Sequence, residues 1–327
     1  LTTRRQRQMC IRDSLNVGDY FIINTDTMLV VNRTMLDSLV DNGGDLTKVC
    51  VSHITDMSQV FENDSSFNQD IGNWDVSNVS SMYAMFEQAT SFNQDIGTWD
   101  VGNVSDMRAM FYRATSFNQD IENWNVSSVT NMASMFYLAT TFNQDIGNWD
   151  VSNVLSMSFM FRGCASFNQD IGNWDVSNVS SMGYMFSYAT TFNQDIRTWD
   201  VSNVSSMDQM FFNATAFDQD LSFWCVTNIT SAPNSFNTNS GMSNWQLPVW
   251  GTCPTIVTGG IVNDNGCIEC DSLNIGDFFI INTDTMLVVD RIMLDSLVDN
   301  GEDLTKVCVS HITDMSQVFE NDSSFNQ

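Results

Sequence analysis

The chain has 327 residues and a formal net charge of −27, with 12 lysines and arginines against 39 aspartates and glutamates. Phosphate contacts need clusters of basic side chains, so this balance excludes a nucleic-acid-binding protein. Hydrophobic residues make up 43% of the sequence, enough for a continuous core. No apolar run is long enough to cross a bilayer, and we expect no membrane insertion in this fragment.

Residues 1–14 differ from the rest of the chain. The stretch from Arg4 to Ser14, RRQRQMCIRDS, holds four arginines and reads like a translated frame of a sequencing adapter joined to the gene. We therefore expect these residues to be disordered and to lie outside the fold.

Residues 15–56 predict an N-terminal cap. Two β-rich runs within DYFIINTDTMLVV, residues 19–31, flank a turn-forming stretch and predict a hairpin. Met35 to Asn42 then predicts a helix that ends at Gly43.

A 25-residue unit is repeated seven times without a gap over residues 57–224. Its motif, FNQD or FDQD, begins at Phe67, Phe92, Phe117, Phe142, Phe167, Phe192 and Phe217. A tryptophan keeps the same step from Trp74 to Trp224. Such strict spacing requires every copy to meet its neighbours in the same way, which predicts the stacked coils of a solenoid.

Two local patterns alternate within one unit. Met82, Met85, Phe86 and Ala89 fall on one face of a short helix, whereas the spaced large residues from Phe92 to Val101 suit a short strand with tight turns. The predicted fold class is therefore an α/β, leucine-rich-repeat-like solenoid with one short parallel strand and one short helix per coil. Residues expected in its core include Phe92, Ile96, Trp99, Val101, Met107, Met110, Phe111, Phe117 and Trp124.

The repeat gives way to an irregular C-terminal cap at residues 225–255, which holds the three prolines of the chain. After a linker at 256–271, residues 272–327 repeat residues 14–69 with five substitutions, at Ile275, Phe278, Asp290, Ile292 and Glu302. These last residues read as the truncated N-terminal cap of a second module. We expect a longer tandem array in which neighbouring modules contact one another.

The cysteines gather at the caps. Cys225 and Cys253 bracket the C-terminal cap, and we expect them to form a disulfide. Cys270 and Cys308 bracket the second N-terminal cap in the same manner and are expected to form another. Cys267 and Cys270 also make a C-x-x-C, for which zinc or redox chemistry is the alternative, although nothing supplies the second half of such a site.

Carboxylates recur at one position of every unit and would lie about 4.8 Å apart in parallel stacking. Like charges at that distance repel by roughly 0.9 kcal/mol per pair even in water, so the column needs neutralising. Backbone N–H groups in Asx turns are one solution, and calcium is the other. The candidate calcium ligands are Asp70, Asp95, Asp120, Asp145, Asp170 and Asp195.

The segment VSSMYAMFEQATSFNQDI, residues 79–96, resembles the 25- or 26-residue repeat of BspA-type bacterial surface proteins, the DUF285 type, which is related to leucine-rich repeats. The resemblance runs from about Ser52 to Trp224. It implies a cell-surface solenoid in which the asparagines of the Asn68 position bond backbone between coils. Phe, Met and Trp stand where leucines are usual, which leaves the curvature open.

The sequence has no G-x-S-x-G, P-loop or H-E-x-x-H motif, and we expect no catalysis in this fragment. We expect an extracellular or cell-surface protein that adheres to a protein or a glycan. One alternative is a structural spacer or surface-layer stalk; another is part of a carbohydrate-active enzyme whose catalytic domain lies outside this chain. Positions that vary between units, such as Tyr83, Arg108, Ala133, Ser158, Gly183 and Asp208, mark where specificity would lie.

Overall fold

The computed structural model describes residues 15–23 and 25–254, together with six short strands between 256 and 308. The chain divides into two compact units. Unit 1 comprises Leu1–Gln219 and Ala232–Gly241, and unit 2 comprises Asp220–Ser231 and Met242–Gln327. Residues 1–14, which we expect to be an adapter translation, lie outside the described part.

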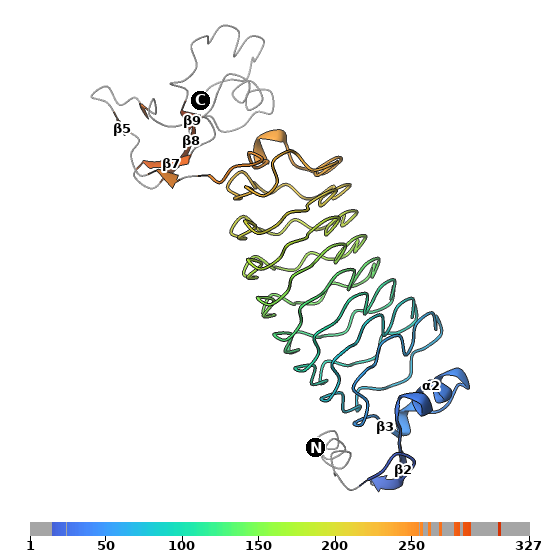
Figure 1. Cartoon of the computed structure of the whole chain (residues 1–327). Helices are drawn as coiled ribbons and strands as arrows, with labels where there is room; N and C mark the ends of the chain where they lie inside the picture. Colours follow the sequence, from blue (N-terminus) through green and yellow to red (C-terminus); the bar gives the residue numbers. More distant parts are fainter. Residues whose placement is uncertain are drawn as a thin grey trace. The chain divides into compact units, whose positions relative to one another are not determined.

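Unit 1 opens with a small sheet and one helix (Figure 1). Strands β1 (Tyr20–Ile23) and β2 (Asp26–Val30) pair antiparallel, and β3 (Val49–Cys50) lies parallel to β2. Helix α2 (Arg33–Asp41) begins at Asn32, whose side chain accepts a hydrogen bond from the Met35 N–H, and the chain leaves it through Gly43, with φ of 67°. A single 3-10 turn, η1 (Leu46–Lys48), leads into β3.

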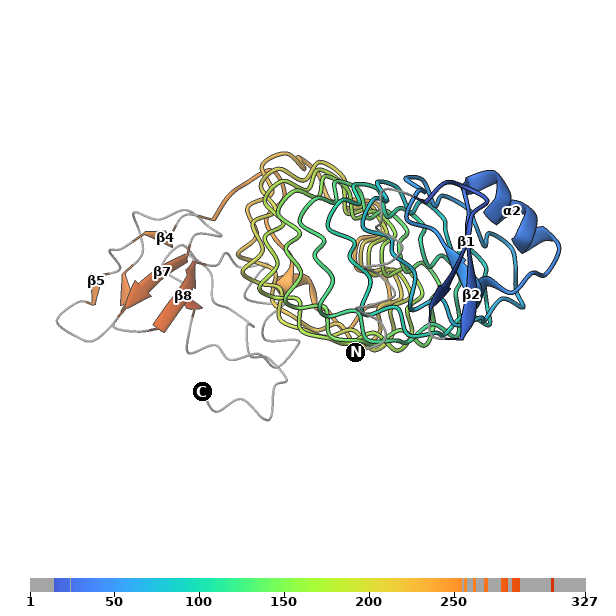
Figure 2. The ribbon, with the colours of Figure 1, turned by 90° about the horizontal axis from the view of Figure 1, so that it is seen from below.

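Within unit 1 the 25-residue repeats stack as coils, and each coil lies over the next when seen along the stack (Figure 2). Adjacent coils meet in isolated parallel bridges of one residue each, from Asp56 with Ser81 to Ser181 with Ser206. The strand predicted over Phe92–Val101 is wrong, because the described coils contain no strand there. Side chains take up the backbone donors of this segment: the Asn93 N–H, for example, donates to Oδ1 of Asn68 at 3.0 Å.

The helix predicted over Met82–Ala89 is also wrong, because the segment forms two consecutive turns. The Met85 N–H donates to the Met82 carbonyl at 3.2 Å, and the Ala89 N–H to the Phe86 carbonyl at 3.1 Å. The second central residue of each turn has positive φ, 52° at Ala84 and 58° at Gln88, as in type II turns. A right-handed helix excludes that conformation.

Hydrogen bonds between coils explain why the chain forms turns here and not a helix. Alternate N–H groups of the turns donate to carbonyls of the next coil, as from Ala84 to Arg108 at 2.8 Å and from Gln88 to Tyr112 at 2.7 Å. The same bonds recur from coil to coil and form columns of peptide groups that all point in one direction. In an α-helix these N–H groups would donate to carbonyls of the same coil, and the carbonyls of the next coil would be left without donors.

The interior of each coil is filled by aromatic and sulfur-containing side chains. The Phe86 and Phe111 rings lie 5.6 Å apart and those of Trp99 and Trp124 6.5 Å apart, each pair parallel to within 4°. Offset stacking of this kind adds to the stabilisation from burial alone. The residues expected in the core are all buried, namely Phe92, Ile96, Trp99, Val101, Met107, Met110, Phe111, Phe117 and Trp124.

Unit 2 begins with the last partial coil and the C-terminal cap. A 3-10 turn, η2, spans Asn244–Gln246. The Leu221 N–H donates to the carbonyl of Gln246, and the Val226 N–H donates to the carbonyl of Thr252. Its remaining described strands are β4 (Ile256–Val257), β5 (Ile261–Val262), β6 (Ile268–Glu269), β7 (Phe278–Ile281), β8 (Asp284–Val288) and β9 (Val307–Cys308). Phe278 in β7 pairs with Leu287 in β8, as Tyr20 pairs with Leu29 in β1 and β2, so the sequence repeat is matched in strand register.

A glycine substitution distinguishes the turns from a helix. Ala109 has φ of 55°, which costs alanine roughly 1–2 kcal/mol and costs glycine little. We expect Ala109→Gly to raise the free energy of unfolding by about 0.5–1 kcal/mol, measured by urea unfolding. In a helix the same change would lower it by about 1 kcal/mol. The control is Ala114→Gly in the same coil, a buried position without positive φ, where a loss is expected.

Candidate binding face

Sequence variation in the coils concentrates on four positions of the two turns. Counting from the Met that begins a coil, they are the first, second, fifth and sixth residues after it; in the coil from Met82 they are Tyr83, Ala84, Glu87 and Gln88. We call these positions in the seven coils from Met57 to Met207 the turn face. The corner residues between them, such as Met82 and Phe86, are buried and recur in every coil, so the core stays constant while the turn face varies.

Aromatic rings run along the middle of the turn face. The rings of Tyr112 and Tyr137 stack 4.5 Å apart, and those of Phe159 and Tyr184 stack 4.6 Å apart. Tyr137 and Phe159 join the two pairs at 6.4 Å in a tilted arrangement. Rigid rings of this kind, half-buried on a surface, offer large contact area at little cost in conformational entropy.

Two arginines lie on these rings. The Arg162 guanidinium lies 5.3 Å from the Tyr137 ring, 5.7 Å from Phe159 and 5.1 Å from Tyr184, and that of Arg113 lies 5.5 Å from Tyr112. Cation–π contacts hold such groups in place. Among the described residues neither arginine has a carboxylate within ion-pair distance, since the ion pairs there involve Arg33, Lys48, Arg108 and Arg197.

The acidic end of the turn face lies on the N-terminal side of these rings. Burial raises the pKa of Glu87 and so does the neighbouring charge of Glu62, while Arg113 acts in the opposite direction. Burial also raises the pKa of Tyr112. The turn face therefore combines negative charge, aromatic rings and positive charge along one surface of an acidic protein.

The repeated carboxylates are held by their own backbone. Oδ1 of Asp70, Asp95, Asp120, Asp145, Asp170 and Asp195 accepts a hydrogen bond from the N–H two residues later, at 2.9–3.1 Å. A second column, from Asp75 to Asp200 with Asn125 in its gap, makes the same Asx turn at 3.0–3.2 Å. No three Asp, Glu, His or Cys side chains in the described ranges gather into a metal-binding group.

Calcium removal tests the alternative role of these carboxylates. Because Asx turns already engage one oxygen of each, we expect the thermal transition of the chain to be the same with EDTA as with added calcium. A lower melting temperature in the chelator would show instead that calcium binds the folded chain.

The Asx turns make stability depend on pH. Hydrogen bonds from Ser177, first through its side chain and then through its backbone, lower the pKa of Asp175. The ionised Asp175 carboxylate therefore stabilises the fold above the ordinary pKa of a carboxyl group, and this stabilisation is lost as pH falls through the lowered pKa. We expect Asp175→Asn to keep the turn, as Asn125 does. Between about pH 7 and pH 2, its free energy of unfolding, measured in urea, should fall less than that of wild type. An unchanged acid-side loss would contradict this.

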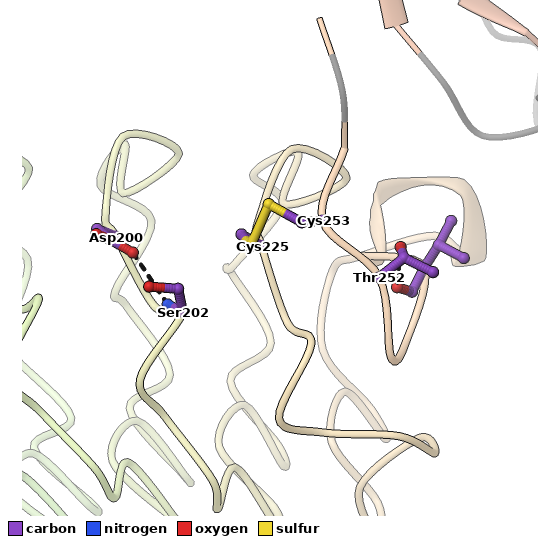
Figure 3. Close-up of a disulfide and its surroundings, with 6 residues drawn as sticks. Asp200, Ser202, Cys225, Thr252 and Cys253 are labelled. Atoms are coloured by element: carbon purple, nitrogen blue, oxygen red, sulfur yellow. Dashed lines mark hydrogen bonds between the residues drawn. A yellow bond between two sulfur atoms is a disulfide. The ribbon is translucent and has the colours of Figure 1, made fainter. Parts of the chain in front are cut away.

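The cysteines differ in their surroundings. Cys225 and Cys253 form a disulfide across 28 residues in unit 2 (Figure 3), and Cys225 stands where the coils carry the Asp200-type carboxylate. Cys164, at the usual alanine position of its coil, is buried, donates to the Phe136 carbonyl, and has its pKa raised by burial. Cys267 and the predicted Cys270–Cys308 pair lie outside the residues whose side chains the structure describes.

A pocket of about 490 Å³ lies between α2 and the first coil of unit 1. Its lining includes Asp37, Asp41, Glu62 and Asp64, and its one cation, Arg33, is bound to Asp37 at 2.6 Å. This acidic surface has no feature that selects a ligand, so the turn face is the stronger candidate.

Sequence reasoning identified Tyr83 and Arg108 as variable positions but missed the aromatic cluster around Arg162. Phe159 and Tyr184 stand at the second position after their Met and Tyr137 at the fifth, whereas the sequence prediction considered only the first. The signal that could have found them was the confinement of variation to four positions of the unit.

None of the helices in the described part of the chain has the length and apolar character that crossing a membrane requires. Comparisons with curated proteins and with solved structures gave no match. A family model described as "Mycoplasma protein of unknown function, DUF285" matches residues 32–147, 138–250 and 291–327. Because these matches cover more than half of the chain, the protein belongs to the DUF285 family of repeat proteins.

Proposed function

We propose that this chain is an extracellular or cell-surface binding array that adheres to a protein or a glycan through the turn face and catalyses no reaction. The observation that carries the proposal is the contrast between the two sides of each turn. Corner residues are buried and constant, whereas the turn-face positions vary and include the Arg162 cluster on Tyr137, Phe159 and Tyr184. A surface that recognises one partner needs such variety, because identical units offer only one repeated contact.

The chemistry of the turn face also suits recognition. Tyrosine and arginine are the side chains most enriched at energetically important contacts, and guanidinium groups fixed on rings present their N–H donors to carboxylates or hydroxyls. The disulfide between Cys225 and Cys253 is consistent with an oxidising compartment such as the cell exterior. The likeness of the repeat to BspA-type surface proteins supports the same location.

The alternative function is a structural spacer or surface-layer stalk that projects another domain. The continuous columns of backbone hydrogen bonds and stacked rings favour it, since they make the array rigid along its axis. A spacer needs no particular side chain on the turn face.

Binding measurements distinguish the two functions. The full chain is applied to a glycan array of neutral and acidic oligosaccharides and to a surface carrying the wild-type chain, alongside the variant Tyr137→Ser/Arg162→Ser. Retention of wild type with loss of retention in the variant supports recognition by the turn face. The matched control is Arg197→Ser, an arginine off the turn face that pairs with Asp195. No retention of wild type on either surface would favour the spacer.

A further inference from the structure

Charged and aromatic residues on the turn face are ordered along the stack. At the fifth position after the Met, the coils carry Glu62 and Glu87 on the N-terminal side, Tyr112 and Tyr137 in the middle, and Arg162 beyond them. Reversing this order places acid opposite base and tyrosine opposite tyrosine. The column is therefore complementary to an antiparallel copy of itself.

We propose that the turn face binds a second copy of this chain, antiparallel, about a two-fold axis between the coils that begin at Met107 and Met132. The inference rests on the proposed function and names its partner. Tyr112 then faces Tyr137 of the second copy, and Glu87 faces Arg162 of the second copy. Since the interface is isologous, the Glu–Arg contact occurs twice.

Charge supports this pairing. Burial and Glu62 disfavour the ionised form of Glu87 more than Arg113 favours it. Arg162 has no carboxylate at ion-pair distance among the residues described, and the rings beneath it fix its position. A contact between the two would stabilise the charge of Glu87 and give Arg162 a carboxylate. Complementary charges of this kind set the register of an interface more than its raw affinity.

Coil spacing supports the same register. Both copies share one coil spacing, so the match continues along the stack without slipping.

A parallel pairing does not offer this match. It would bring Glu87 against the coil from Met82 of the second copy, whose turns, MYAMFEQAT, contain no basic residue. The antiparallel arrangement is also the one that arrays projecting from two opposed surfaces form when they meet. The proposed adhesion would then be homophilic.

Charge reversal tests the register. Sedimentation velocity of the full chain at physiological salt is expected to show a concentration-dependent dimer. Glu87→Arg and Arg162→Glu should each weaken it about tenfold or more, because each variant places like charges opposite one another twice. An equimolar mixture of the two variants should dimerise again, since the mixed pair restores both contacts. Glu122→Arg is the matched control: it makes the same charge change off the turn face, at the position where a later coil carries Arg197 paired with Asp195, and it should leave the dimer intact.

Melting curves of each variant establish that loss of the dimer is not loss of the fold. The inference is overturned if wild type stays monomeric at every concentration, or if the mixture associates no better than its components. Wild type that is monomeric yet binds a glycan through the turn face would overturn the partner and leave the proposed function standing. Absence of both self-association and glycan binding would overturn the two together.

Discussion

Replacing Trp124 by alanine is expected to lower the free energy of unfolding by about 3–5 kcal/mol. The Trp124 ring is buried between those of Trp99 and Trp149, at 6.5 and 6.4 Å, and its indole N–H donates to the Ile96 carbonyl at 3.1 Å. Alanine leaves a cavity in the middle of the stack and removes that donor. Urea unfolding followed by far-ultraviolet circular dichroism measures the loss.

Trp124→Phe separates packing from the hydrogen bond. Phenylalanine keeps a ring in the stack but leaves the Ile96 carbonyl without its donor, for which we expect a loss of about 1–3 kcal/mol. Equal losses in the two variants would contradict a stabilising role for the stacked rings, because the ring at position 124 would then contribute nothing beyond its hydrogen bond.

Removing the disulfide is expected to destabilise unit 2 by about 3 kcal/mol, because Cys225 and Cys253 close a loop of 28 residues. The change to make is Cys225→Ser/Cys253→Ser. Amide hydrogen exchange should then speed up in residues 220–231 and 242–254, which form the C-terminal cap, with little change in the coils of unit 1.

The matched variant is Cys225→Asp/Cys253→Ser. Asp200 stands at the same position of its coil and accepts from the Ser202 N–H at 3.0 Å, so an aspartate at 225 should restore that turn (Figure 3). We expect it to recover about 1 kcal/mol of the loss without the crosslink. Exchange that is equally slow with and without the disulfide would contradict the role assigned to it.

The repeat period and the core were predictable from the sequence. Ring stacks such as those of Phe92 with Phe117 and Trp99 with Trp124 require one side chain type at one spacing, and that requirement is visible in every unit. The disulfide was predictable from position, because Cys225 and Cys253 bracket the C-terminal cap where the repeat ends.

The backbone of the coils was not predictable in the same way. Buried residues at Met82, Met85, Phe86 and Ala89 fit either a short helix or two consecutive turns, since both place them on one side. Hydrogen bonds to the next coil decide for turns, and these bonds are not visible in one unit considered alone. Neither Ala84 nor Gln88 is a glycine, and the signal for positive φ lay in other coils, where Asn63, Gly163 and Asn213 stand at the Gln88 position.

The candidate site was missed for a different reason. A helix and two turns both place the four turn-face positions opposite the buried residues, but only the first of them, at residues such as Tyr83 and Arg108, was identified as variable. The cluster around Arg162 needed all four, because its three ring partners come from three adjacent coils.

The coils combine a constant core with a variable turn face. Recognition of a partner by the turn face is tested most directly by exchanging the residues of that face. The coils from Met107, Met132 and Met157 receive neutral turn-face residues found in other coils, namely serine, glutamine, serine and asparagine, as at Ser58, Gln59, Ser187 and Asn63. Binding is then compared with wild type on the glycan array and on immobilised wild-type chain. We predict a circular dichroism spectrum and melting temperature like those of wild type, together with loss of retention. Retention equal to that of wild type would contradict recognition by the turn face.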